Sequence, residues 1–186
     1  VSFALDGVAE DRSAWLTQPY QLPPPGKRTR FAGYPGASDD TAAELASRAY
    51  ANGWQLAVQA NGDAAIDQFL GALRAAAAKQ PGKDRHPLLI GAQTIRDDQL
   101  DALKEAGAGV SFAPQRLALS QHALGDWLLG AERTARFAPA GAAARRGVPV
   151  LLFADPALVA PAPLATLAAA VRRPAGEDQQ LAPVHA

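Results

Sequence analysis

Short apolar runs alternate with longer segments of helical periodicity along most of the chain. Five of these runs are nearly continuous in apolar residues, which is typical of strands buried on both faces of a sheet. They are Val1–Leu5, Trp54–Ala60, Pro87–Gln93, Val110–Ala113 and Val148–Ala154. Strands that alternate with helices of about 10–15 residues predict βα units and a parallel sheet.

Helix signals follow each of these runs. Ser38 offers an N-cap for the first helix, Asp39 and Asp40 fall in its first turn, and Gly53 ends it. The other helices are expected from Asp63 to before Pro81, from Asp97 to Ala106, from Glu132 to Arg146 and from Leu164 to Arg172. We expect residues 114–127 to be irregular, and the Pro- and Gly-rich loop 18–36 is long enough to be functional.

The predicted fold class is therefore α/β, with about five βα units. An open doubly wound sheet needs about that many units, whereas a closed (β/α)8 barrel of the TIM type needs eight. The alternation of strands and helices fits an open sheet and part of a barrel equally well.

Composition argues against several classes of partner and site. The 18 basic and 18 acidic residues balance, and neither sign forms a block, so no nucleic-acid partner is expected. No run reaches the roughly 18 apolar residues of a membrane span, so no membrane partner is expected either. The absence of cysteine excludes disulfides and thiolate metal sites.

The two ends of the chain are abrupt. The first residues already form a strand-like run, so we expect no signal peptide, and the lack of methionine suggests a processed, partial or excised chain. The compartment stays open between the cytoplasm and the periplasm of a bacterium. His185, near the other end, is given no role.

Few side chains are candidates for chemistry. No Walker-type loop and no GxGxxG, GxSxG, HExxH or HxH motif is present. Asp155 follows the most apolar strand, where it is either a site residue or a turn residue before a proline. His122 is a weak candidate for a ligand or base. His86 is expected at the surface, and Asp6 and Asp63 are expected to serve turns or helix caps.

Several phrases of the sequence resemble one family. They are "DGVAEDRSAWLTQPY", "YANGWQLAVQANGDAAIDQ", "LLIGAQTIRDDQLDALKEAG", "LGAERTARFAP" and "RRGVPVLLFADPALVAP". Together they are similar to the amidohydrolase superfamily, and within it to the family 3 branch that includes the N-substituted formamide deformylases. The resemblance covers residues 1–173, which leaves residues 174–186 as a tail.

The resemblance implies a distorted (β/α)8 barrel that hydrolyses amide or formamide C–N bonds. One or two divalent metals such as zinc would lie at its C-terminal mouth. The family holds them with an HxH on strand one, a lysine or acid on strand four and histidines on strands five and six. An aspartate at the end of strand eight carries the proton. On this map the chain is the C-terminal part of the barrel, strands four to eight.

The family's ligand positions can be assigned one by one. The resemblance places Ser2 at the lysine of strand four, Gln59 at the histidine of strand five and Gly91 at the histidine of strand six. Asp155 occupies the proton-shuttle position of strand eight. A carboxamide does not replace imidazole on a zinc-like ion, and glycine has no ligand to offer. We therefore expect no metal and no other cofactor in this chain.

Three hypotheses follow. The chain is a degenerate, catalytically inactive member of the family that keeps its pocket for a small amide-like ligand. Alternatively, it is an active metal-dependent hydrolase with other ligands or with a missing N-terminal part. The third hypothesis is a structural fragment or engineered partial barrel, whose open sheet edges favour homo-oligomers or strand-swapped association.

Overall fold

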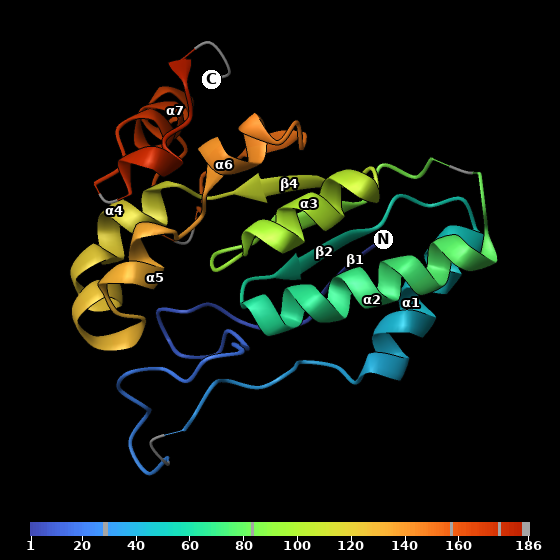
Figure 1. The fold of residues 1–186 in the computed structure, drawn as a ribbon, viewed down its shortest axis with the longest axis horizontal. Helices are drawn as coiled ribbons and strands as arrows, with labels where there is room; N and C mark the ends of the chain where they lie inside the picture. Colours follow the sequence, from blue (N-terminus) through green and yellow to red (C-terminus); the bar gives the residue numbers. More distant parts are fainter. Residues whose placement is uncertain (28–29, 83, 157, 175, 184–186) are drawn as a thin grey trace.

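Five parallel strands form one sheet in the order in which they follow along the chain (Figure 1). The computed structural model describes residues 1–27, 30–82, 84–156, 158–174 and 176–183. The strands are β1 (Ser2–Ala4), β2 (Ala57–Ala60), β3 (Leu88–Gly91), β4 (Gly109–Phe112) and β5 (Val150–Leu152). A doubly wound sheet reverses its strand order, and this sheet does not. The sheet is therefore a partial barrel of the TIM type, as the resemblance implied.

Helices connect successive strands. They are α1 (Asp39–Ala51), α2 (Asp63–Lys79), α3 (Asp97–Glu105), α4 (Gln115–His122), α5 (Ala131–Ala135), α6 (Ala140–Arg145) and α7 (Pro163–Val171). A π-helical turn, η1 (Ala123–Leu128), continues α4, and a 3-10 turn, η2 (Glu177–Gln179), follows α7. No helix in the described ranges is long and apolar enough to cross a membrane.

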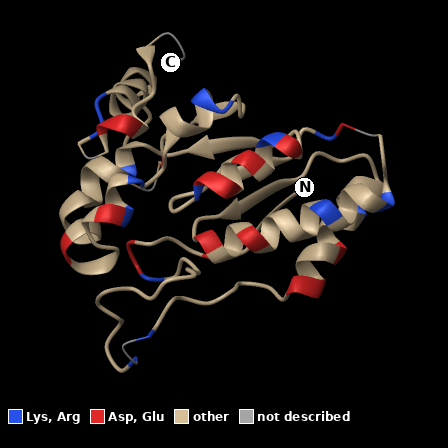
Figure 2. Ribbon diagram, viewed as in Figure 1, with Lys and Arg blue, Asp and Glu red and all other residues tan. Residues whose placement is uncertain are grey.

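The first three helices begin where the sequence predicts. The Ser38 hydroxyl accepts a hydrogen bond from the backbone N–H of Thr41 at 3.2 Å, which caps α1. Asp63 is the first residue of α2 and Asp97 the first residue of α3. Figure 2 shows these acidic helix starts, with basic and acidic residues otherwise scattered over the ribbon.

The core lies between the sheet and the helices that cover it. One hydrophobic cluster joins Phe69 of α2, Leu89 of β3 and Leu100 of α3, all almost fully buried. On α1 the buried positions are largely alanines, and their small side chains let α1 pack closely on α2 (Figure 1). This layer fixes the strand ends, where the loops that bear polar groups begin.

Three expectations about secondary structure are wrong. Trp54 lies outside β2 and is 51% exposed, because the chain is still in the loop that leaves α1. The stretch 114–127, expected to be irregular, lies almost entirely within α4 and η1. The single helix expected from Glu132 to Arg146 is two helices, because Pro139 cannot continue α5 and Ala138 takes a positive φ of 48°.

The segment after α7 folds back onto the preceding units. The N–H of Leu181 donates to the carbonyl of Ala170 at 3.1 Å, and Arg145 of α6 donates to the carbonyl of Asp178. Leu181 and Gln179 are buried. His185 lies outside the described residues.

Candidate functional site

The carboxyl ends of β2 to β5 surround a cavity of about 90 Å³. Three of the four positions singled out by the resemblance line it, namely Gln59, Gly91 and Asp155. In the sheet Gln59 of β2 pairs with Ile90 of β3. Gly91 therefore lies one residue further toward the carboxyl end of the strands than Gln59. The three residues come from separate strands that converge at one edge of the sheet, which is where barrel enzymes place their chemistry.

Ser2 and His122 lie away from this cavity. Ser2 pairs with Ala57, two residues before Gln59, and lines a shallow surface hollow at the opposite end of the strands. His122 is the last residue of α4 and is exposed. His86 is exposed as expected, and its Nδ1 lies 3.3 Å from a carboxylate oxygen of Asp84.

Gly91 leaves no room for a side chain. Its φ is +96°, a conformation that favours glycine. A Cβ there would lie 2.2 Å from Oδ1 of Asn61. Asn61 is fixed in turn, because its Nδ2 donates to the carbonyl of Gly7 at 2.8 Å. The space that a histidine would need at this position is filled by an anchored amide.

A guanidinium reaches the aspartate at the mouth. Nη2 of Arg116, in the first turn of α4, donates to Oδ2 of Asp155. Nη1 of Arg116 donates to Oε1 of Glu10 at 3.1 Å. All three side chains are mostly buried, with exposures of 16%, 21% and 19% for Arg116, Asp155 and Glu10. The cation therefore joins two carboxylates from opposite ends of the chain across the cavity.

Gln93 extends this network toward the first loop. Its Nε2 donates to Oε2 of Glu10 at 2.9 Å, and its Oε1 accepts from the N–H of Ala9 at 2.8 Å. Its backbone carbonyl accepts from the N–H of Ala138 at 2.8 Å. Each oxygen of Glu10 thus has one donor, and the loop after β1 is tied to the loop after β3.

Asp6 locks the turn beneath the cavity. Its carboxylate accepts hydrogen bonds from the backbone N–H groups of Asn61, Gly62 and Trp15 at 2.7–2.9 Å. Burial raises the pKa of Asp6 to about 6, against the lowering effect of these three donors. These hydrogen bonds hold the backbone of a turn, which is the role expected for Asp6. Asp63 likewise accepts from the N–H of Thr17 at 2.8 Å.

The residues at the mouth do not fit a divalent metal. Gly91 and its neighbour Asn61 exclude an imidazole, Gln59 offers only a neutral amide, and the carboxylate of Asp155 already binds the cation of Arg116. In the described ranges no group of three or more His, Cys, Asp or Glu side chains is placed to hold a metal ion.

Sequence reasoning missed the polar residues that organise this mouth. Arg116 stands in "PQRLALSQH", within the stretch 114–127 that was expected to be irregular. Glu10 and Gln93 follow β1 and β3, as Asp155 follows β5. Their common signal is a polar side chain shortly after a predicted strand. That signal could have identified these residues as candidates, although it does not predict which of them contact each other.

Comparison with solved structures supports this assignment of the fold. A metal-dependent hydrolase of uncharacterised function from Pyrococcus furiosus is 26% identical, with a TM-score of 0.77 over 93% of this chain and 34% of its own. One from Pyrococcus horikoshii is 22% identical, with a TM-score of 0.80 over 97% of this chain and 36% of its own. The chain therefore spans about a third of these proteins.

The family assignment comes from the sequence as a whole. A search of curated proteins finds no match to this chain. The family model described as "Amidohydrolase family", that of the family 3 branch, matches residues 1–185, close to the full length. By this match, the chain belongs to the amidohydrolase family.

Proposed function

We propose that residues 1–186 form a metal-free, catalytically inactive part of an amidohydrolase barrel, with a guanidinium where the family carries a metal. One observation carries the proposal, namely the contact of Arg116 with both Asp155 and Glu10 at the mouth. Because the chain spans about a third of the solved structures, the proposal is confined to this part of the barrel.

Electrostatics supports this proposal. Arg116 already holds both carboxylates in a mostly buried site, so a metal ion would have to displace the guanidinium or lie beside its weakly screened positive charge. The guanidinium also satisfies the carboxylates with directed hydrogen bonds, which is the geometry that arginine provides. The guanidinium thereby offsets the charge of one of the two carboxylates without a metal, and Asp155 serves structure in place of proton transfer.

The volume of the cavity limits the size of the ligand that it can hold. About 90 Å³ has room for roughly three water molecules or for one amide of formamide size. Gln59, Asn61 and Gln93 line it with amide groups beside apolar walls such as Phe137 and Phe153. Amides donate and accept hydrogen bonds at once, and so would complement a small amide-like ligand.

Elemental analysis by plasma mass spectrometry tests the metal-free state. The chain is purified without chelator and measured before and after dialysis against zinc, together with assays of N-benzylformamide hydrolysis. We expect far less than one metal per chain in both samples and no turnover. About one tightly held zinc per chain, with a hydrolysis rate that a chelator abolishes, would contradict the proposal.

The Arg116→Ala variant serves as the matched comparison. It removes the cation but leaves Gln59 and Gly91 unchanged. The site therefore still lacks histidine side chains that could bind a metal at these two positions. If the variant also stays free of zinc, the replaced ligand positions are sufficient to exclude metal. If it binds zinc stoichiometrically, the guanidinium alone excludes the metal, which still supports its place at the metal position.

A second candidate role is association through the sheet edges, favoured by the exposure of β5. Leu151 is 47% exposed in an edge strand, and Leu158 and Leu164, which follow it, are 48% and 81% exposed. Edge strands with exposed apolar side chains pair readily with other strands. Light scattering should then give a mass above 19.3 kDa, whereas a monomer at all concentrations would remove this candidate.

A further inference from the structure

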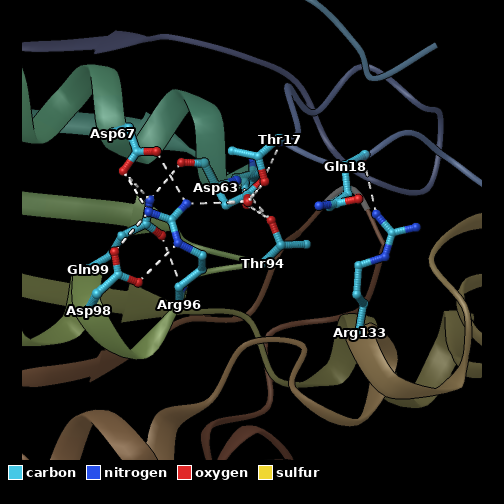
Figure 3. Close-up of polar contacts among 10 residues, drawn as sticks. Thr17, Gln18, Asp63, Asp67, Thr94, Arg96, Asp98, Gln99 and Arg133 are labelled. Atoms are coloured by element: carbon cyan, nitrogen blue, oxygen red, sulfur yellow. Dashed lines mark hydrogen bonds and ion pairs between the residues drawn. The ribbon is translucent and has the colours of Figure 1, made fainter. Parts of the chain in front are cut away.

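A second hollow, of about 420 Å³, lies outside the barrel mouth. Its walls come from the loop after β1, the start of α2, the loop between β3 and α3, and the helix α5 (Figure 3). It shares no lining residue with the cavity at the strand ends. Its volume is within the range of roughly 300–1,000 Å³ that small-molecule sites occupy.

The acidic groups on one side of this hollow already have cationic partners. Arg96 donates to Asp63, Asp67 and Asp98, as Figure 3 shows. Asp63 also accepts from both the N–H and the hydroxyl of Thr17. These carboxylates have little capacity left, so they do not make the hollow a site for a cation.

Arg133 on the opposite side has a different environment. Its guanidinium donates to three backbone carbonyls, those of Leu129 at 2.7 Å, Gln18 at 3.2 Å and Pro19 at 3.0 Å. No carboxylate lies within ion-pair distance of it in the described part of the chain. Burial lowers the pKa of Arg133, because it removes part of the hydration of the charge, and the more distant carboxylate of Asp63 opposes this effect only in part.

This arrangement leaves Arg133 rigid and incompletely satisfied. A guanidinium has five N–H donors, and the three carbonyls use one each. A partly desolvated cation that meets only neutral carbonyls is costly to maintain, and an anion would remove that cost. The remaining donors and the net charge both favour an acceptor that is negatively charged.

Arg136 adds a second cation one turn further along. It lines the same hollow, and within the described part of the chain its one side-chain hydrogen bond is from Nη2 to Asp97 at 2.6 Å. Asp97 is shared, because Arg146 also lies 3.2 Å from the same carboxylate oxygen. The free donors of Arg133 and Arg136 therefore belong to two arginines spaced three residues apart.

The floor of the hollow is apolar. Most of the surface that lines it belongs to carbon atoms, to which Leu16 and Ile95, at 3% and 1% exposure, contribute only their few accessible atoms. An anion without carbon, such as sulfate, would leave this surface uncovered, whereas an aliphatic chain would bury it. The two halves of the hollow thus match the two ends of a short fatty acid.

We propose that this hollow binds a small aliphatic monocarboxylate, with the carboxylate held by Arg133 and Arg136 and the chain packed on the carbon atoms that line the rest of the hollow. The site lies beside the mouth and does not depend on whether the mouth holds a metal. It gives the chain a binding activity of its own, separate from the proposed loss of catalysis.

Butyrate and butyramide, compared at constant ionic strength, test the proposal on the whole chain. The two probes have the same shape and differ in charge, so butyramide controls for the apolar contact. We expect butyrate to raise Tm with a saturable dependence and to shift the Nε–H signal of Arg133 in a nitrogen-edited NMR spectrum. Butyramide should do neither. Equal effects of both probes, or none from butyrate, would overturn the proposal.

Arg136→Gln separates binding from folding, because Arg136 holds no loop carbonyl in place. We expect it to weaken butyrate binding about tenfold, the value of one charge-assisted contact. Arg74→Gln is the matched control, since Arg74 is an exposed arginine on α2 outside the hollow, and it should bind butyrate as the wild type does. Equal affinity of the Arg136→Gln variant and the wild type would place butyrate elsewhere and overturn the proposal.

Discussion

The Oδ1 atom of Asn61 stands 2.2 Å from the point that a Cβ at Gly91 would occupy. Gly91 is the last residue of β3, Asn61 follows the neighbouring strand β2, and Asn61 is anchored to the carbonyl of Gly7. At the position that the resemblance assigns to a histidine, the space for a side chain is thus filled by Asn61. Placing a histidine there would require moving a residue that the first loop depends on.

Gly91→Ala should destabilise the protein by about 2–4 kcal/mol. The methyl group meets Asn61, and a φ of +96° is strained for any residue with a Cβ. Urea unfolding followed by circular dichroism measures the change.

Gly71→Ala provides the control for this substitution. A Cβ at Gly71, within α2, would meet nothing within 4 Å, and alanine favours the helix over glycine. This variant should gain about 1 kcal/mol. If both variants lost stability equally, the contact with Asn61 would not be the cause of the loss at Gly91.

The pair formed by Arg116 and Asp155 should couple measurably. Replacing either partner, by Arg116→Met or Asp155→Asn, should cost about 1–3 kcal/mol, because mostly buried charges lose their counter-charge. A double-mutant cycle should give a coupling of about 1–2 kcal/mol.

The exposed pair of His86 and Asp84 is the reference for that cycle. Its side chains are 78% and 67% exposed, so water screens the attraction and its coupling should stay below about 0.5 kcal/mol. A coupling at Arg116 and Asp155 as small as this reference would argue against a guanidinium that stabilises the mouth.

Asp6 should make stability depend on pH in a defined direction. Its pKa is raised from 3.8 to about 6, so the folded protein favours the protonated form. The contribution of that form is fully present below pH 3.8 and is lost as pH rises through about 6. Relative to Asp6→Asn, the wild type should lose about 3 kcal/mol between pH 3.5 and pH 7.

Unfolding of both proteins across this range gives the difference, and the carbon-detected NMR titration of the Asp6 carboxyl gives its midpoint. Comparison with Asp6→Asn cancels the contribution of every other titrating group. A difference that stays constant with pH, or one that grows as pH rises, would contradict the raised pKa.

Ser38→Ala should cost about 1 kcal/mol by removing the N-cap of α1. Ser47→Ala, at a half-buried position inside the same helix, should change stability little, since the better helix propensity of alanine offsets the lost surface hydrogen bond from Lys79. Thermal unfolding of the two variants side by side measures the effect of the cap. A similar loss in both would point to a general effect of serine removal.

Local chemistry explains what the sequence predicted well. The cap at Ser38 and the helix starts at Asp63 and Asp97 depend on residues within one turn, so a single stretch of sequence suffices to identify them. The resemblance assigned Gln59, Gly91 and Asp155 to one site, and they line one cavity because parallel strands end at one edge, whereas Ser2 lies at the other end of the strands.

Tertiary contacts explain what the sequence did not predict. Arg116 meets Asp155 across 39 residues and Glu10 across 106, and no periodicity encodes such a meeting. The same holds for Trp54, whose apolar character suggested a strand although the chain enters β2 only at Ala57. The positive φ of Ala138 is likewise imposed by its N–H bond to the Gln93 carbonyl.

The order of the strands has a consequence for how the protein is made. Each strand from β2 onward pairs with the strand that precedes it along the chain. During synthesis each of the strands β2 to β5 therefore pairs with a strand that has already left the ribosome. None of these four pairings needs a strand that is synthesised later. The sheet can grow by one unit at a time, and removal of the last unit leaves every earlier strand pair complete.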